Sequence, residues 1–238
     1  MMIKAWRLGG RVVVEVHKTS CIVQWPPGGS AEFLVNSANE RLEGCRRPYV
    51  PRGGPLPALG PTGERSDAWG GLEIGAGMVY RSQSVDGVVD LMGGRSLARE
   101  RSRVLQERGL LAPGDAVLTP ATERLLENKY RFVVHAVAPY WKAPAWAPRL
   151  TAAYEAALAL CATSAAMPLL GAGARGAPIE EAAAIAARAV LDHSYIGRPK
   201  VLRFACLEHD TAHSLSRAFD DHFLLHSNDS TTTTTTTT

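Results

Sequence analysis

Cysteine is scarce in this sequence, and its few occurrences are widely spaced. The four cysteines are Cys21, Cys45, Cys161 and Cys206, and no two of them form a C-x-x-C pair. This pattern gives no sign of a disulfide scaffold. We therefore expect a reduced, intracellular protein, either cytoplasmic or nuclear.

Long hydrophobic runs and a large charge of one sign are also missing. The N-terminal segment 1–16 has no apolar stretch long enough for a signal peptide, and nothing approaches a membrane span, so we expect no membrane contact. The net charge of +3 gives no reason to expect a nucleic-acid partner. A group of nearby arginines is expected to form a solvated helix face; they are Arg95, Arg99, Arg101, Arg103 and Arg108.

The composition that is present is that of a globular domain. Hydrophobic residues make up 46% of the 238-residue chain and charged residues 21%, so residues 1–226 are expected to form one domain. Residues 40–77 are rich in proline and glycine, and we expect a surface insertion without regular structure that covers a binding cleft as a lid. Residues 227–238 end in eight threonines and are expected to form a disordered tail.

Strand and helix patterns alternate along most of the chain. Strands are expected at 12–16, 32–35, 116–118, 130–137, 164–169 and 201–207, and helices at 97–108, 150–161, 179–191 and around Leu215 to Phe223. Residues 85–94 are expected to form a turn followed by an apolar segment. The alternation predicts an α/β fold with a mixed, mostly parallel sheet covered by helices on both faces. Ligands of such sheets bind in the loops at the carboxyl ends of the strands.

A glycine-rich loop, "GAGARG" at 171–176, connects an expected strand to a helix that starts near Pro178. Glycines allow positive φ and close approach of a ligand, and a helix N-terminus offers unpaired N–H groups, so the loop suits a phosphate or diphosphate. A tight connection without a ligand is the alternative. The loop also matches G-x-G-x-x-G, but Glu208 lies 37 residues beyond Gly171, where a Rossmann fold has its acid after about 20. An NAD-binding enzyme is therefore less favoured.

Six motifs, in order, resemble those of the macro domain family. They are "LVNSAN" at 34–39, "VDGVV" at 85–89, "APGDAVLT" at 112–119, "FVVHAVAP" at 132–139, "LTAAYEAAL" at 150–158 and "MPLLGAGARGAP" at 167–178. The resemblance implies a three-layer α/β/α sandwich that binds ADP-ribose, or an ADP-ribosylated protein, in a cleft over the sheet. It implies no further cofactor.

The resemblance also assigns roles to residues. Asn39, with Asn36 before it, would contact the distal ribose, and Val85, Asp86 and Gly87 would form a first diphosphate loop. Asp86 and Asn39 occupy the positions of the residues with which some family members hydrolyse ADP-ribosyl esters. The second diphosphate loop would consist of Leu170, Gly171, Ala172, Gly173, Ala174, Arg175 and Gly176.

Each assignment has a structural alternative. Asn36 and Asn39 could equally form Asx turns at a strand end. The "VDG" segment could be only a turn or a helix cap. Arg175 could fork onto a diphosphate or be a solvated loop residue.

Two further observations concern histidine. His135 lies within an apolar strand and is expected to be a core histidine whose hydrogen bonds are satisfied. His209 and His213 have the spacing of a helical metal pair, but no third ligand is evident, so no metal site is expected.

Four features depart from the family pattern. Ser82, Gln83 and Ser84 replace the glycines that usually precede "VDG", and the segment 17–23 lacks the acid that holds adenine. Arg175 replaces an aromatic residue, and the 40–77 insertion separates two motifs that are usually adjacent. Hydrolysis of ADP-ribosyl esters, such as mono-ADP-ribosyl protein or O-acetyl-ADP-ribose, therefore competes with a non-catalytic role as an ADP-ribose reader.

Overall fold

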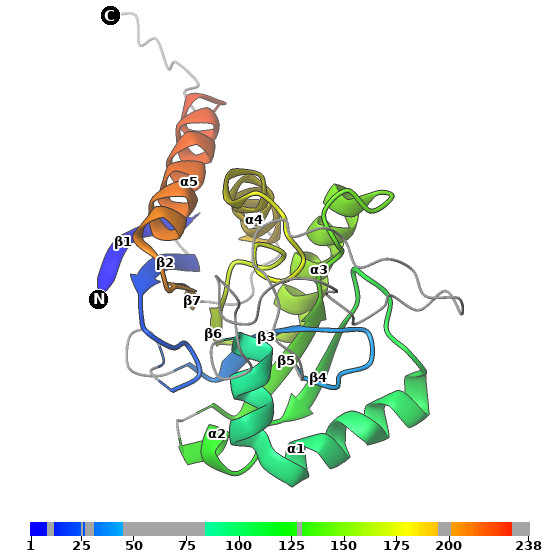
Figure 1. Cartoon of the computed structure of the whole chain (residues 1–238). Helices are drawn as coiled ribbons and strands as arrows, with labels where there is room; N and C mark the ends of the chain where they lie inside the picture. The colour runs from blue at the N-terminus through cyan, green and yellow to red at the C-terminus, as the bar shows by residue number, and fades with distance from the viewer. Residues whose placement is uncertain are drawn as a thin grey trace, which may run out of the picture.

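The computed structural model describes residues 1–8, 12–24, 26, 31–44, 84–127, 130–194 and 201–229. Within these residues, seven strands form one sheet in the order β1-β2-β7-β6-β3-β5-β4 (Figure 1). The strands are β1 (Met2–Leu8), β2 (Val12–Lys18), β3 (Phe33–Ala38), β4 (Ala116–Pro120), β5 (Phe132–Val137), β6 (Ser164–Met167) and β7 (Val201–Cys206).

The middle of the sheet is parallel and its edges are antiparallel. Neighbours from β2 through β7, β6 and β3 to β5 pair in parallel, whereas β1 and β4 pair antiparallel with β2 and β5. This confirms the predicted mixed, mostly parallel sheet. The carboxyl ends of five strands consequently meet along one edge, where the loops of an α/β fold carry ligand sites.

Helices cover both faces of the sheet (Figure 1). They are α1 (Val85–Arg108), α2 (Arg124–Glu127), α3 (Trp146–Leu160), α4 (Ile179–Ser194) and α5 (His209–Asp229). One buried cluster joins α3, α4 and α5 to one sheet face, and a second joins α1 and α2 to the other. The three-layer sandwich is thus confirmed.

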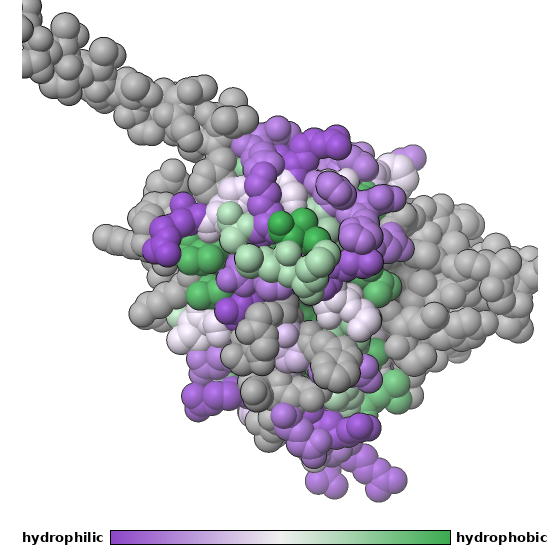
Figure 2. All heavy atoms as spheres, turned by 90° about the vertical axis from the view of Figure 1, so that its left-hand side faces the viewer, coloured by the Kyte–Doolittle hydropathy of each residue, from purple (hydrophilic) through white to green (hydrophobic). Residues whose placement is uncertain are grey.

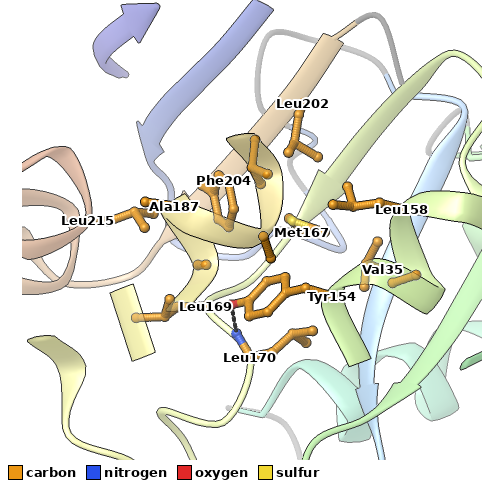
Figure 3. Packing of buried hydrophobic residues seen from close by; sticks show 14 of the residues in the cluster. Val35, Tyr154, Leu158, Met167, Leu169, Leu170, Ala187, Leu202, Phe204 and Leu215 are labelled. Carbon is orange, nitrogen blue, oxygen red and sulfur yellow. Dashed lines mark hydrogen bonds between the residues drawn. The ribbon is translucent and has the colours of Figure 1, made fainter. Parts of the chain in front are cut away.

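The central strands are apolar along their whole length because both of their faces are buried. In β3, Leu34 packs toward α1 while Val35 packs toward α3, and in β5 Val133 and Val134 divide in the same way. Figure 3 shows the side covered by α3 and α4, where Met167 lies between Phe204 of β7 and Tyr154 of α3, and Val35 lies next to Tyr154.

The outer surface of the N-terminal edge is polar. Figure 2 shows hydrophilic side chains over most of the described part of this face, with apolar ones in small patches. Among the described residues, none of the helices combines the length and the apolar character that a membrane crossing requires.

The structure differs from the sequence expectations at three places. The helix expected at 97–108 is only the second half of α1, which already begins at Val85, because Ser84 caps it and the apolar residues that follow pack on the sheet. Strand β1 and helix α2 were not expected from the sequence. Three residues of the expected tail, 227–229, belong to α5, and most of the predicted insertion (45–77) and the threonines lie outside the described residues.

Candidate functional site

The glycine loop follows β6 at the carboxyl edge of the sheet. Gly171 has φ 82° and Gly176 has φ 75°, conformations in which a side chain is strained. The Leu170 N–H donates to the Tyr154 hydroxyl over 2.8 Å, as the dashed line in Figure 3 marks. Since Tyr154 belongs to α3, this hydrogen bond fixes the entry to the loop against the helical layer.

Two more hydrogen bonds fold the loop on itself. The N–H of Gly176 donates to the carbonyl of Gly173, and that of Ala177 to the carbonyl of Gly171, each over 3.0 Å. Within the part of the chain that the structure describes, the N–H groups of residues 172–175 have no acceptor. A row of such N–H groups directly before a helix, here α4, is an arrangement to which an anion can bind.

Arg175 is not the solvated loop residue that was considered as one alternative. Its guanidinium is 7% exposed and forms two parallel hydrogen bonds with the Glu40 carboxylate, of 3.0 and 2.9 Å. It also lies over the ring of Tyr140, 4.2 Å from the ring centre. Arg175 is therefore not solvated, and it ties the glycine loop to the segments that follow β3 and β5.

Asp86 lies in the first turn of α1. The Ser84 hydroxyl accepts a hydrogen bond from the Gly87 N–H over 3.1 Å, and Ser84 has the extended backbone of an N-cap residue. Of the alternatives considered for "VDG", the helix cap is the one that the structure shows. Ser82 and Gln83 lie outside the described residues.

Asp86 is part of a buried polar cluster that spans three strands. The Asn36 amide nitrogen is 2.7 Å from Asp86 Oδ1 and 3.2 Å from His135 Nδ1, and His135 Nε2 is 3.0 Å from the Thr119 hydroxyl. Asn36 of β3 and His135 of β5 are direct neighbours in the parallel register. The sheet thus brings together residues of three separate sequence motifs.

His135 is a neutral core histidine, as the sequence predicts. Since the Asn36 amide donates to Nδ1, the ring proton resides on Nε2 and is donated to Thr119. Burial, together with the nearby Arg101 guanidinium, lowers the pKa of His135 well below its ordinary value. His135 consequently supports Asn36 and is not a base.

Arg101 is the functional residue that the sequence analysis missed. It was assigned to a solvated face, and Arg95, Arg99, Arg103 and Arg108 are indeed exposed, but Arg101 itself is 2% exposed. One guanidinium nitrogen is 3.0 Å from Asp90 Oδ1, and the other is 3.6 Å from Asp86 Oδ1. The helical spacing carried a signal, because Arg101 shares a face with the buried Leu97 and Val104, but its partners could not be identified because their approach depends on a kink in α1 at Gly94.

The surroundings of Asp86 favour its protonated form. Burial, the largest effect, raises the pKa of Asp86, and the Asp90 carboxylate adds to the increase. Arg101, the Asn36 hydrogen bond and Arg175 oppose it. Arg175 joins the glycine loop to Glu40, just beyond β3, and Asn36 of the same strand is bonded to Asp86, so the loop and Asp86 are both tied to β3 and the residues directly after it. A buried carboxyl group with a raised pKa is suited to exchanging a proton with a ligand or a water.

Asn39 stabilises the loop that follows β3. Its carbonyl oxygen accepts hydrogen bonds from the N–H groups of Arg41 and Glu43, and its amide donates to the Gly44 carbonyl over 3.2 Å. This is the Asx-turn alternative. The amide that contacts Asp86 belongs to Asn36 instead. Gly44, with φ 77°, leaves no room for a side chain because a Cβ would lie 2.8 Å from Asp90.

The remaining candidate groups lie apart from this cluster. Thr19, where the adenine-binding acid would be expected nearby, donates to the carbonyl of Cys21 over 3.4 Å, and Ser20 is exposed. His209 and His213 are exposed on α5. In the described residues, no group of three or more potential metal ligands occurs.

Comparison with known sequences places this site within a family. The Macro domain family model matches residues 74–186. A macro domain-containing protein of Caldanaerobacter subterraneus is 32% identical over 143 residues, which are 58% of this chain and 79% of the relative. The O-acetyl-ADP-ribose deacetylase of Klebsiella pneumoniae is 34% identical over 137 residues, covering 54% of this chain and 75% of that enzyme.

Solved structures agree on the fold. The Oceanobacillus iheyensis macrodomain with ADP superimposes with a TM-score of 0.66 at 17% identity, covering 95% of this chain and 99% of that one. The Trypanosoma brucei macrodomain in complex with ADP-ribose gives 0.57 at 18% identity, covering 86% and 68%. Taken with the sequence relatives, these matches show that the chain belongs to the macro domain family.

Proposed function

We propose that this protein binds ADP-ribose, free or attached to a protein, and hydrolyses an ester at its distal ribose. One observation carries the proposal: a glycine loop whose N–H groups at 172–175 have no acceptor in the described structure is tied through Arg175 and Glu40 to the end of β3, the strand whose Asn36 is bonded to the buried carboxyl group of Asp86. The relatives named as O-acetyl-ADP-ribose deacetylases support both parts of the proposal.

In this proposal the diphosphate is bound mainly by backbone groups. The loop 171–176 contributes the N–H groups of residues 172–175, while the Leu170 N–H is already bonded to Tyr154. The first turn of α1, with Val85, Asp86 and Gly87, forms the opposite wall. Phosphate oxygens and a helix N-terminus attract each other because the unpaired N–H groups carry partial positive charge.

Two asparagines are available for the distal ribose. The Asn36 carbonyl oxygen is buried and accepts no hydrogen bond from the described residues, so a ribose hydroxyl or a water can donate to it. Asn39 can bind the ribose only if some of the hydrogen bonds within its own loop are exchanged for bonds to the ligand.

The reaction follows from the position of the carboxylate. Asp86 removes a proton from a water molecule while the water oxygen attacks the acyl carbon of the ester. The bond between the acyl carbon and the ribose oxygen then breaks, and the proton passes to the ribose oxygen. The products are a carboxylic acid and ADP-ribose with a free hydroxyl, and Asp86 returns to its ionised form.

A non-catalytic reader is the second candidate, and one observation favours it. Asp86 is only 7% exposed, and one of its oxygens already contacts Asn36 and Arg101. A carboxylate held in this way could orient a bound ribose without activating water.

We further propose an intracellular location and an ADP-ribosylated protein as the partner. Cys21, Cys161 and Cys206 are free thiols, as a reducing compartment requires. Burial raises the pKa of Cys161 and of Cys206 to about 12, so neither is a reactive thiolate at neutral pH. Residues 40–77 are proposed to be an insertion within one domain.

Calorimetric titration of the full chain tests the binding step. ADP-ribose should bind more tightly than AMP or NAD, and Gly173→Val should abolish binding because its side chain fills the space that a phosphate needs. Ala5→Val, on the exposed side of β1, serves as a control that leaves binding unchanged. Equal ADP-ribose affinities of wild type and Gly173→Val would exclude the loop from the site.

Single-turnover hydrolysis tests the chemical step. With a mono-ADP-ribosylated protein or O-acetyl-ADP-ribose as substrate, Asp86→Ala should lose about 10²–10⁴-fold in rate while keeping much of its ADP-ribose affinity. If wild type and Asp86→Ala hydrolyse the ester equally, or neither exceeds the uncatalysed rate, the reader function replaces the hydrolase.

A further inference from the structure

Helix α1 is bent sharply, and the bend brings distant residues together. Gly94 interrupts the helix with φ 56° and ψ −152°, and Figure 1 shows two segments at a steep angle. In a straight helix, Asp86 and Arg101 would be about 22 Å apart along the axis. The bend reduces the separation to 3.6 Å between a guanidinium nitrogen and Asp86 Oδ1.

The contact joins three charges in a buried place. Asp86 and Asp90 are one helical turn apart and share a face of the first segment, so both carboxylates are directed to the same side. Arg101 comes from the second segment and is 2% exposed, and its shorter contact, 3.0 Å, is with Asp90. One guanidinium therefore compensates two carboxylates, of which Asp86 is the one that belongs to the proposed site.

The other groups that face Asp86 compensate its charge less than Arg101 does. Asn36 of β3 donates an uncharged hydrogen bond, and behind it His135 of β5 is neutral. Arg175 of the glycine loop has a smaller electrostatic effect and is itself paired with Glu40. Among the described residues, Asp90 and Arg101 thus form the principal charged pair that acts on Asp86.

We propose that Arg101 is a positioning residue that acts through Asp86: with Asp90, it holds the Asp86 carboxylate in one orientation and balances its charge. The catalytic consequence rests on the proposed function, but the effect on Asp86 does not. Arg101 favours the ionised form of Asp86 and Asp90 disfavours it, so the two opposing effects keep the carboxyl group able to gain and lose a proton.

The proposal is testable because removing Arg101 and removing Asp90 should shift the pKa of Asp86 in opposite directions. Removing the guanidinium in Arg101→Met should raise the pKa of Asp86 by about 1–3 units, because a cation within this distance lowers a carboxyl pKa by that amount. Asp90→Asn should lower the pKa of Asp86. The double variant Arg101→Met/Asp90→Asn removes one charge of each sign and should return the pKa toward that of the wild type.

The measurement is a pH titration of the Asp86 side-chain carboxyl by ¹³C NMR in the full chain, with Asp86→Asn to assign the signal. Arg101→Lys keeps the positive charge but not the forked guanidinium. The pKa of Asp86 in this variant should lie between those in the wild type and in Arg101→Met. Single changes that shift the pKa in the same direction, or not at all, would overturn the proposal. If Arg101→Met does not fold, the proposal is tested by two other results. The pKa of Asp86 should be lower in Asp90→Asn, and it should return toward the wild-type value in the double variant.

The pH–rate profile provides the catalytic readout. If the protein hydrolyses the ester, the acidic limb of kcat/KM should move with the NMR pKa in each variant. If it hydrolyses nothing, the NMR titration still tests the role of Arg101, so failure of the proposed function and failure of this inference are distinguishable.

Discussion

Asp86 combines three properties that seldom occur together at a structural position. It is buried, it is bonded to an amide, and burial raises its pKa in spite of the nearby guanidinium of Arg101. The folded chain therefore binds the Asp86 proton more tightly than the unfolded chain does. A group held in this state reduces stability at neutral pH, which is common where a site is arranged for chemistry and not for stability.

The pH dependence of stability follows from the raised pKa of Asp86. The folded-state pKa of Asp86 is raised above 3.8, so ionised Asp86 costs folding free energy at pH above its folded pKa, and the cost disappears as the pH falls toward 3.8. Asp86→Asn should therefore raise the melting temperature at neutral pH, by about 2–4 °C for each kcal/mol recovered.

Scanning calorimetry of wild type and Asp86→Asn across acidic and neutral pH checks this prediction. The gain should shrink as the pH is lowered. Asp192→Asn, which alters an exposed carboxylate on α4, should give no comparable pH-dependent gain. A lower melting temperature of Asp86→Asn at neutral pH would show that the contact with Arg101 outweighs burial.

At the scale of elements, hydrogen bonds between loops and helices hold the site together. The fully buried Tyr154 hydroxyl of α3 accepts the Leu170 N–H at the start of the glycine loop (Figure 3). The kink at Gly94 brings Arg101 into contact with Asp86 and Asp90. The first contact joins two different segments of the chain, and the second depends on the interruption of α1.

Removal of the Tyr154 hydroxyl should weaken both stability and binding. In Tyr154→Phe the Leu170 N–H remains buried without an acceptor, which costs about 1–3 kcal/mol, and the loop loses its attachment to α3. Thermal unfolding and ADP-ribose calorimetry measure the two effects. Trp6→Phe, which removes a hydrogen bond to Asp220 at the opposite edge of the sheet, should reduce stability and leave the affinity unchanged.

The kink of α1 can be tested with two matched glycine variants. At Gly94 a Cβ would lie 2.1 Å from Glu123 Oε2, in a backbone region that only glycine occupies readily, whereas at Gly109, with φ 78°, it would meet no atom within 4 Å. Gly109→Ala should cost about 1–3 kcal/mol from strain alone.

Gly94→Ala should cost more than Gly109→Ala in urea unfolding, because a clash adds to the strain. It should also shift the pKa of Asp86 upward, since Arg101 moves away when the bend opens, and Gly109→Ala should not. Equal unfolding free energies for the two variants would mean that Glu123 moves aside at no cost.

At the scale of the whole molecule, ligand binding and stability are coupled. A ligand that binds only the folded chain adds about 2.7 kcal/mol to the free energy of unfolding at 100 times its Kd, which corresponds to about 5–10 °C in melting temperature for a chain of this size. ADP-ribose should produce this shift in the wild type and no shift in Gly173→Val. A shift of equal size in both proteins would place the binding site elsewhere.

Most of the fold was determined by the sequence alone. The apolar runs and the helical spacing of residues such as Ile179, Ala183 and Ala186 predict the central strands and α4, because periodicity records which side of an element is buried. Strand β1 escaped prediction because its pattern is weak: of its described side chains only Ile3 and Trp6 are partly buried, and the others are exposed. The family motifs, the glycine loop and Asp86 were also identified from local sequence.

What only the tertiary structure decided is which polar groups meet. The contacts Asn36–Asp86, Arg175–Glu40 and Arg101–Asp90 join residues that are between 11 and 135 positions apart. Arg101 shares a helix face with Leu97 and Val104, so its burial could have been predicted from spacing, but its pairing with Asp86 and Asp90 could not. The difference lies in the bend at Gly94 and in the register of β3 with β5, because the energy of a buried charge depends on partners that folding alone brings within reach.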